Sequence, residues 1–108
     1  MKTLSRERPD VYNAFMDMSK TIDESNTLSG KVRELIKLAS CLTQGSSFGV
    51  GLHTRRAYEC GATKDEIIDT IVYCIPIAGI PLTNQALEAA MGTIEVIQQK
   101  NKSSTAQV

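Results

Sequence analysis

The sequence predicts an all-α protein with a single domain. Apolar residues recur at three- and four-residue intervals along most of the chain, and no long stretch alternates apolar and polar residues as a β-strand would. A chain of 108 residues can bury one hydrophobic core but not two. We therefore expect about five or six helices packed around one core.

The first predicted helix begins near Pro9 and is followed by a polar connection. Proline suits a first helical turn, because the N–H that it lacks would have no partner there. Residues 23–27 then interrupt the helical pattern with polar turn formers. We expect residues 1–27 to form an N-terminal helix with its connection, and residues 28–99 to form the core. The apolar residues of the first helix are Val11, Phe15, Met18 and Ile22.

A second helix is predicted between Ser29 and Gly45. Serine is a favourable N-cap, and glycine tolerates the left-handed backbone found at many helix C-termini. The apolar residues between these two ends share one helical face, which we expect to be buried. They are Val32, Leu35, Ile36, Ala39 and Leu42.

Two further helix starts follow in the middle of the chain. Ser46 or Ser47 can cap a third helix, which we expect to stop at Gly61. Thr63, followed three residues later by Glu66, has the spacing of a capping box and marks the start of a fourth helix. The apolar residues of the fourth helix are Ile67, Ile68, Ile71, Val72 and Ile75.

The chain must break or kink between residues 74 and 81. Pro76 removes a helical hydrogen bond and Gly79 adds backbone freedom. Pro81 can then open a last helix, and residues 100–108 are expected to form a short, frayed polar tail. The apolar stripe of the last helix consists of Leu82, Ala86, Ala90, Ile94 and Ile97.

Composition excludes several classes of partner. The 12 basic and 12 acidic residues cancel, whereas a nucleic-acid-binding face needs an excess of basic residues. We expect no membrane span, because no apolar run is long enough. The first residues lack the charged and then apolar pattern of a secretion signal, so we expect a cytoplasmic protein.

Three cysteines, Cys41, Cys60 and Cys74, are present in an odd number without a Cys-x-x-Cys motif. This spacing fits neither a disulfide framework nor a zinc site. Free thiols suit a reducing compartment. We interpret each cysteine as a small buried hydrophobic residue.

Apolar surface exceeds what one small bundle can cover. The fourth helix is apolar on more than one side, and residues 75–82 are almost wholly apolar. Such a surplus is commonly buried between the subunits of a symmetric homo-oligomer. The alternative is a core that covers both faces within one chain.

His53 is the candidate for acid–base chemistry, and Glu34 is its predicted partner. The single histidine has no second histidine or nearby cysteine, so we expect no metal site. The two helices around Gly45 should run antiparallel, which places Glu34 about 16 Å and His53 about 12 Å from the turn. A carboxylate at this level could orient the imidazole. Alternatively, His53 is a packing residue and Glu34 pairs with Lys31 or Lys37.

Arg55 and Arg56 follow His53 within one turn and could bind a substrate carboxylate through paired contacts. Arginine pairs on helices are also often solvated, and we take that state as the default for at least one of them. Ser46 and Ser47 could present hydroxyl and backbone N–H groups to an anion. As helix caps, they need no such role.

Several short motifs together resemble the carboxymuconolactone decarboxylase family, which includes the alkylhydroperoxidase D-like proteins. The similarity extends roughly from Leu28 to Ile97. Its motifs are Arg33-Glu34-Leu35, Gln44-Gly45, His53 with Ala57, Gly61-Ala62-Thr63, Glu66-Ile67, and Gly79-Ile80-Pro81 with Asn84.

The resemblance implies an all-helical subunit that assembles into trimers or hexamers. It places Glu34 and His53 at the glutamate and histidine of the family site and adds Asn84 as a pocket residue. In the alkylhydroperoxidase branch a Cys-x-x-Cys pair precedes the histidine, and aligned on His53 the two thiols fall at Ser46 and Gly49. Disulfide exchange needs two nearby thiols. The decarboxylase branch works without the pair.

We therefore expect cofactor-free acid–base chemistry, a decarboxylation or isomerisation, on a small carboxylated substrate. His53 would act as the acid–base, with Glu34 orienting it; Arg55, Arg56, Ser46 and Asn84 would contact the substrate. One alternative is a peroxiredoxin-like oxidoreductase that uses a single thiol, Cys41 or Cys60. Another is an oligomer that binds a small ligand without catalysis.

Overall fold

The computed structural model confirms the all-α class. It describes the backbone of residues 1–106 and side chains as far as residue 103, and this part of the chain contains no β-strand. The helices are α1 (Lys2–Glu7), α2 (Pro9–Glu24), α3 (Gly30–Thr43), α4 (Ser47–Glu59), α5 (Lys64–Val72), α6 (Ile75–Ala78) and α7 (Ile80–Ala106). The five helices expected from the sequence correspond to α2, α3, α4, α5 and α7.

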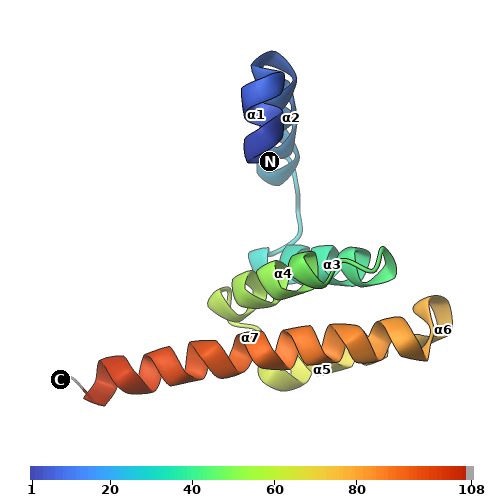
Figure 1. Ribbon diagram of the computed structural model, residues 1–108, viewed down its shortest axis with the longest axis vertical. Coiled ribbons are helices and arrows are strands. Elements are labelled where there is room, and N and C mark those ends of the chain that lie inside the picture. The colour runs from blue at the N-terminus through green and yellow to red at the C-terminus, as the bar shows by residue number, and fades with distance from the viewer. Residues whose placement is uncertain (107–108) are drawn as a thin grey trace.

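The N-terminal hairpin, formed by α1 and α2, stands away from the other helices (Figure 1). The short helix α1 was not expected from the sequence. It packs against α2, and Leu4 and Tyr12 are half-buried in this pair. Pro9 occupies the first turn of α2, as predicted.

Helices α3 and α4 form an antiparallel pair, which is the most extensive contact between elements of the fold. The Ser29 hydroxyl caps α3 by accepting a hydrogen bond from the N–H of Val32 at 3.2 Å. Of the two candidate caps for α4, Ser46 is the one used: it accepts from the N–H of Gly49 at 3.0 Å. Gly45, between the two helices, has a φ of +73°, a left-handed conformation that favours glycine.

The second half of the chain also follows the predicted boundaries. Thr63 and Glu66 form the capping box of α5, with both of its hydrogen bonds present. The expected break is a short helix, α6, followed by Gly79 with a φ of +88°. The tail prediction is wrong for part of its length, because α7 remains helical through Ala106. Residues 107–108 lie outside the described part.

The core lies where α3, α4, α5 and α7 meet, with both α4 and α5 packed against the long helix α7. The expected burial of the α3 face is wrong for Val32 and Ile36, which are 37% and 49% exposed. Val72 on α5, at 41% exposed, belongs to the surplus apolar surface predicted for this helix. Their faces are left without a covering element in a single chain. The buried apolar residues are Leu38, Leu42, Val50, Ala57, Ala62, Ile67, Ile71, Ala86, Ala90 and Ile94.

None of the helices within residues 1–106 combines the length and the apolar character that a membrane span requires.

Candidate functional site

Glu34 and His53 meet across the interface between α3 and α4. Oε2 of Glu34 lies 2.8 Å from Nδ1 of His53, and the two side chains are only 15% and 13% exposed. The antiparallel pairing of the two helices brings the residues together although 19 positions separate them. The contact expected from the spacing is therefore present, while its catalytic role stays a prediction.

The geometry fixes how the imidazole can act. A carboxylate on Nδ1 holds the ring in one orientation and favours a proton on that nitrogen. Among the side chains that the structure describes, none forms a hydrogen bond with Nε2 of His53. Nε2 is therefore the ring nitrogen that is left for contact with a ligand, although neither Glu34 nor His53 lines any of the grooves described below.

Of the two lysines near Glu34 in the sequence, Lys37 contacts it and Lys31 does not. Nζ of Lys37 lies 3.9 Å from Oε1 of Glu34 and also 3.9 Å from Oδ1 of Asp23. Lys31 instead forms a 3.0 Å ion pair with Glu66 on α5. Glu34 thus contacts both His53 and Lys37, so the simple surface pairing that the sequence allowed is only part of its environment.

The two arginines lie on different sides of α4. Arg55 is exposed, lies 3.8 Å from Glu59 through Nε, and lines open grooves against α7. Arg56 is exposed as well, and its position three residues after His53 places it on the neighbouring part of the same helical face. Neither arginine contacts the Glu34–His53 pair, so their substrate roles stay predictions.

The remaining predicted pocket residues lie at the start of helices. Ser46 is half-buried, and its oxygen is used as the cap of α4. Asn84 is exposed in the first turns of α7. Its neighbour Gln85 donates from Nε2 to Oγ of Ser47 at 2.9 Å, which ties α7 to the start of α4. The structure does not bring Asn84 to the Glu34–His53 pair by any described contact.

All three cysteines are free. The expectation that each is buried is wrong for Cys60, which is exposed; Cys41 and Cys74 are partly buried. The thiol of Cys74 donates to the carbonyl oxygen of Thr70 at 3.4 Å, and burial raises the pKa of this thiol. No group of three or more potential metal ligands occurs among the described residues.

Cys41 lies close to the two positions at which the family resemblance would place thiols. A Cβ atom built on Gly49 would lie 2.5 Å from Sγ of Cys41 and 3.0 Å from Oγ of Ser46. The space beside α4 that a side chain at position 49 would need is therefore filled by the Cys41 thiol. The contact between Cys41 and Gly49 could not be read from the sequence, because it depends on how α3 faces α4.

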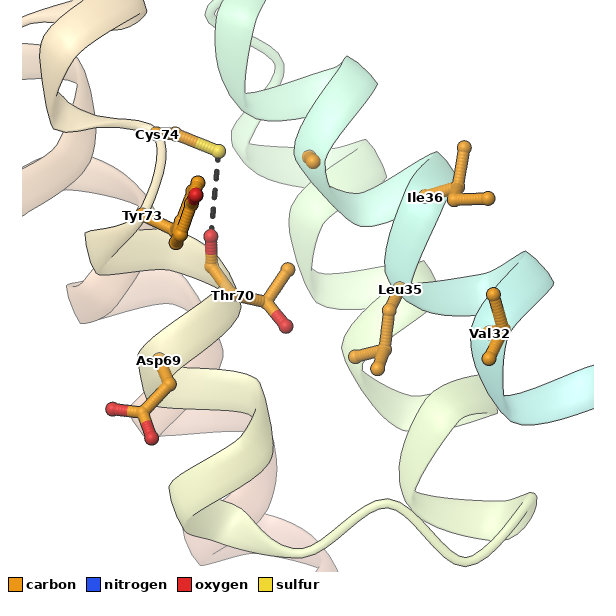
Figure 2. A pocket seen from close by; sticks show the side chains of 8 residues that line it. Val32, Leu35, Ile36, Asp69, Thr70, Tyr73 and Cys74 are labelled. Carbon is orange, nitrogen blue, oxygen red and sulfur yellow. Dashed lines mark hydrogen bonds between the residues drawn. The ribbon is translucent and has the colours of Figure 1, made fainter.

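An open apolar groove between α3 and α5 was also missed by sequence reasoning. Figure 2 shows it, with Leu35 and Thr70 directed into the space between the two helices. The groove has a volume of about 460 Å³, and neither Glu34 nor His53 lines it. The available signal was Leu38, which extends the apolar surface of α3 beyond the single face expected from the sequence and is fully buried in the core. The lining residues are Val32, Leu35, Ile36, Ala39, Asp69, Thr70, Tyr73 and Cys74.

The fold and the paired carboxylate and imidazole define a small all-α protein with a potential acid–base centre. The sequence of residues 9–91 matches the family model of the carboxymuconolactone decarboxylase family. The chain belongs to this family.

Individual relatives carry little functional information. A protein of Methanocaldococcus jannaschii, named as uncharacterized, is 29% identical over 84% of this chain and 85% of its own length. A 4-carboxymuconolactone decarboxylase of Acinetobacter baylyi is 34% identical, over 54% of this chain and 43% of that enzyme. An uncharacterized protein of Cupriavidus necator is 27% identical over 72% of this chain and 69% of its length.

Proposed function

We propose that this protein catalyses a cofactor-free decarboxylation or isomerisation of a small carboxylated substrate, with His53 as the acid–base group. The 2.8 Å contact between His53 and Glu34 in a largely buried setting carries the proposal. Membership of the carboxymuconolactone decarboxylase family supports it. The name of the relative from Acinetobacter baylyi suggests a carboxylated lactone as the first substrate to test.

In a decarboxylation, the bond between the ring carbon and the carboxylate breaks and carbon dioxide leaves. The electron pair of that bond stays on the substrate as an enolate, and a proton must then reach carbon. Nε2 of His53 would supply this proton while Glu34 stabilises the imidazolium through Nδ1. The ring then recovers its proton from water.

A carboxylated substrate also needs a cation. Arg56 is the better placed of the two arginines, because it follows His53 by three residues, whereas Arg55 faces α7 and pairs with Glu59. Ser46 and Asn84 are proposed as further substrate contacts. The Ser46 oxygen accepts from the backbone as a cap, which leaves its hydroxyl proton available to a ligand.

We include a homo-oligomer, a trimer or a hexamer, and a cytoplasmic location in the proposal. The exposed apolar faces of α2, α3 and α5 support assembly. The free state of all three cysteines is the state expected in a reducing compartment.

The experiment is a decarboxylation assay with 4-carboxymuconolactone, followed by release of carbon dioxide. His53→Gln should lower kcat at least about tenfold, since positioned acid–base groups typically contribute 10²–10⁴. Glu34→Gln should lower kcat by a smaller factor. Glu95→Gln, the same change at an exposed site on α7, serves as the matched control and should leave kcat unchanged. Full activity of His53→Gln would refute the proposal.

The single-thiol alternative is tested with the same protein. The two candidate thiols are Cys41, which lies beside Ser46 and Gly49, and Cys60, which is exposed. Peroxide consumption that is lost in Cys41→Ala or in Cys60→Ala and retained in His53→Gln would favour the oxidoreductase over the decarboxylase.

A further inference from the structure

The two oxygens of the Glu34 carboxylate have different partners. Oε2 lies 2.8 Å from Nδ1 of His53, whereas Oε1 lies 3.9 Å from Nζ of Lys37. Lys37 follows Glu34 by three residues on α3, a spacing that places both side chains on one face of the helix. Because the Glu34 side chain is only 15% exposed, it connects the ammonium to the imidazole in a largely buried setting.

Lys37 is also the residue at which the N-terminal hairpin meets α3. Its Nζ lies 3.9 Å from Oδ1 of Asp23, near the end of α2. The backbone of Asp23 is held as well, because Nη1 of Arg33 donates to its carbonyl oxygen at 2.9 Å. A small groove of about 200 Å³ lies at the same junction. Most of the hairpin stands away from the other helices (Figure 1), yet Asp23 is only one ion pair away from Glu34.

An ammonium group beside Glu34 opposes the charged form of the imidazole. A carboxylate on Nδ1 favours the imidazolium, whereas a nearby like charge disfavours it. The chain of contacts keeps Nζ of Lys37 within about 9 Å of the His53 ring, a distance at which like charges shift a titration by about 0.3 pH unit even in water. The carboxylate of Asp23 has the opposite sign and binds the same ammonium, so it reduces this effect.

Within residues 1–103, Lys37 is the one cation that forms an ion pair with Glu34. Charged groups on the other elements packed against α3 and α4 pair with one another or line grooves that include neither Glu34 nor His53. Arg56 is exposed three residues after His53, and the Cys41 thiol lies against Gly49, one turn before it. The other charged groups are the pairs Lys31–Glu66 and Arg55–Glu59, together with Asp69, Glu88 and Lys100.

We propose that Lys37 and Asp23 are positioning residues that set the protonation of His53, and that the N-terminal hairpin acts on the candidate site through them. Lys37 binds the oxygen of Glu34 that His53 leaves unused and keeps the ring from remaining permanently charged. Asp23 binds Lys37 and limits that effect. A ring with this balance can both take up and release a proton, as an acid–base group must. The catalytic consequence of this inference rests on the proposed function, whereas the protonation of His53 does not.

The experiment follows the ring protons of His53 by NMR as the pH is varied, in the full chain, without substrate and at low salt. The sequence contains a single histidine, so the signal is unambiguous. Lys37→Met should raise the midpoint of this titration by at least about 0.3 pH unit, because a positive charge near the imidazolium is lost. Asp23→Asn should lower the midpoint by at least about 0.1 pH unit, because Lys37 then acts on Glu34 without its second partner.

Two residues of α2 provide matched controls. Lys20→Met and Asp17→Asn make the same changes of charge at exposed positions, of which Lys20 pairs with Glu24 on its own helix. Each control should shift the midpoint by less than half as much as its matched variant. Opposite shifts in Lys37→Met and Asp23→Asn would also exclude a general loosening of the fold, which has no reason to change sign between them. Helical circular dichroism verifies the folding of every variant.

Three results would overturn the proposal. An unchanged midpoint in Lys37→Met, or a shift that Lys20→Met reproduces, would remove the role of Lys37. A shift in Asp23→Asn no larger than that in Asp17→Asn would show that the hairpin does not act on the pair. Asp23→Asn should also lose more than half of its effect when it is combined with Lys37→Met, and a full effect there would show that Asp23 does not act through the lysine.

The pH profile of kcat separates this inference from the proposed function. If His53 is the acid–base group, the limb of the profile that reports it should move in Lys37→Met in the same direction as the NMR midpoint. A midpoint that moves while the kcat profile stays in place would refute the catalytic role of His53 and support the control of its protonation by Lys37.

Discussion

Sγ of Cys41 on α3 fills the space beside Gly49 on α4, so that a Cβ atom at position 49 would lie 2.5 Å from the sulfur. These two residues are close neighbours because α3 and α4 pack antiparallel. A glycine at this point lets the helices approach, and the thiol occupies the volume that a larger residue would take. A side chain at position 49 would therefore need a change on α3 as well as on α4.

The first prediction follows from this contact. Gly49→Ala should destabilise the protein by about 1–3 kcal/mol through overpacking, partly offset by the better helix propensity of alanine. In a Cys41→Ala background the same substitution should cost at least about 1 kcal/mol less, since the pair is in contact. Urea denaturation of the four proteins measures this coupling. Equal costs in both backgrounds would mean that the sulfur does not restrict position 49.

The second prediction concerns the hydroxyl of Thr54, which is fully buried and has no hydrogen-bond partner among the described residues. Thr54→Val should stabilise the fold by about 1 kcal/mol, because it removes an unsatisfied polar group and keeps the branched shape. Thr83 is an equally buried control whose hydroxyl donates to the carbonyl of Gly79 at 2.8 Å. Thr83→Val should therefore give no gain in the free energy of unfolding.

The third prediction is a pH dependence at the start of α5. The backbone N–H of Thr63, followed by the ammonium of Lys31, lowers the pKa of Glu66 below its ordinary value of 4.5. A carboxylate with a lowered folded-state pKa adds stability above its unfolded-state pKa and loses it as the pH falls through the folded value. Wild type should thus be more stable than Glu66→Gln at neutral pH.

The stability difference between wild type and Glu66→Gln should shrink progressively below pH 4.5. Thermal denaturation at a series of pH values gives the difference directly. Lys31→Met should weaken the pH dependence, because it removes one of the groups that favour the ionised form. A difference that stays constant through the acid range would contradict the assignment.

The fourth prediction separates two roles of Ser46. Ser46→Ala should destabilise the protein by about 1 kcal/mol, because it removes the N-cap of α4. Ser46→Asp and Ser46→Asn both restore a capping oxygen and should be close to wild type in thermal stability. If the hydroxyl also donates to a substrate carboxylate, Ser46→Asp should raise KM and Ser46→Asn should not. Equal KM values would limit Ser46 to its structural role.

The fifth prediction distinguishes the two arginines in the proposed reaction. Arg56→Gln should raise KM for a carboxylated substrate about tenfold or more, since a charge-assisted contact to a carboxylate is lost. Arg55→Gln should change KM little, because Arg55 faces α7 and pairs with Glu59. Steady-state kinetics of both variants makes the comparison. A larger increase in KM for Arg55→Gln than for Arg56→Gln would indicate that the substrate binds on the α4–α7 side of the molecule.

Local signals in the sequence determined most of the helices and one side-chain pair. The caps Ser29, Ser46 and Thr63 mark helix starts because their oxygens satisfy backbone N–H groups a few residues away. Glu34 and His53 could be paired because a tight turn fixes the register of two helices of known rise. Helix α1 and the continuation of α7 past residue 100 lacked a comparable apolar pattern.

The tertiary structure alone decided which apolar faces are covered. Val32 and Leu38 lie on the same helix, yet Leu38 is fully buried and Val32 lines an open groove, because burial depends on which element packs against each face. The contact between Cys41 and Gly49 and the unpaired hydroxyl of Thr54 depend on the same packing. Periodicity defines the faces of a helix, whereas their neighbours follow from contacts between residues far apart in the chain.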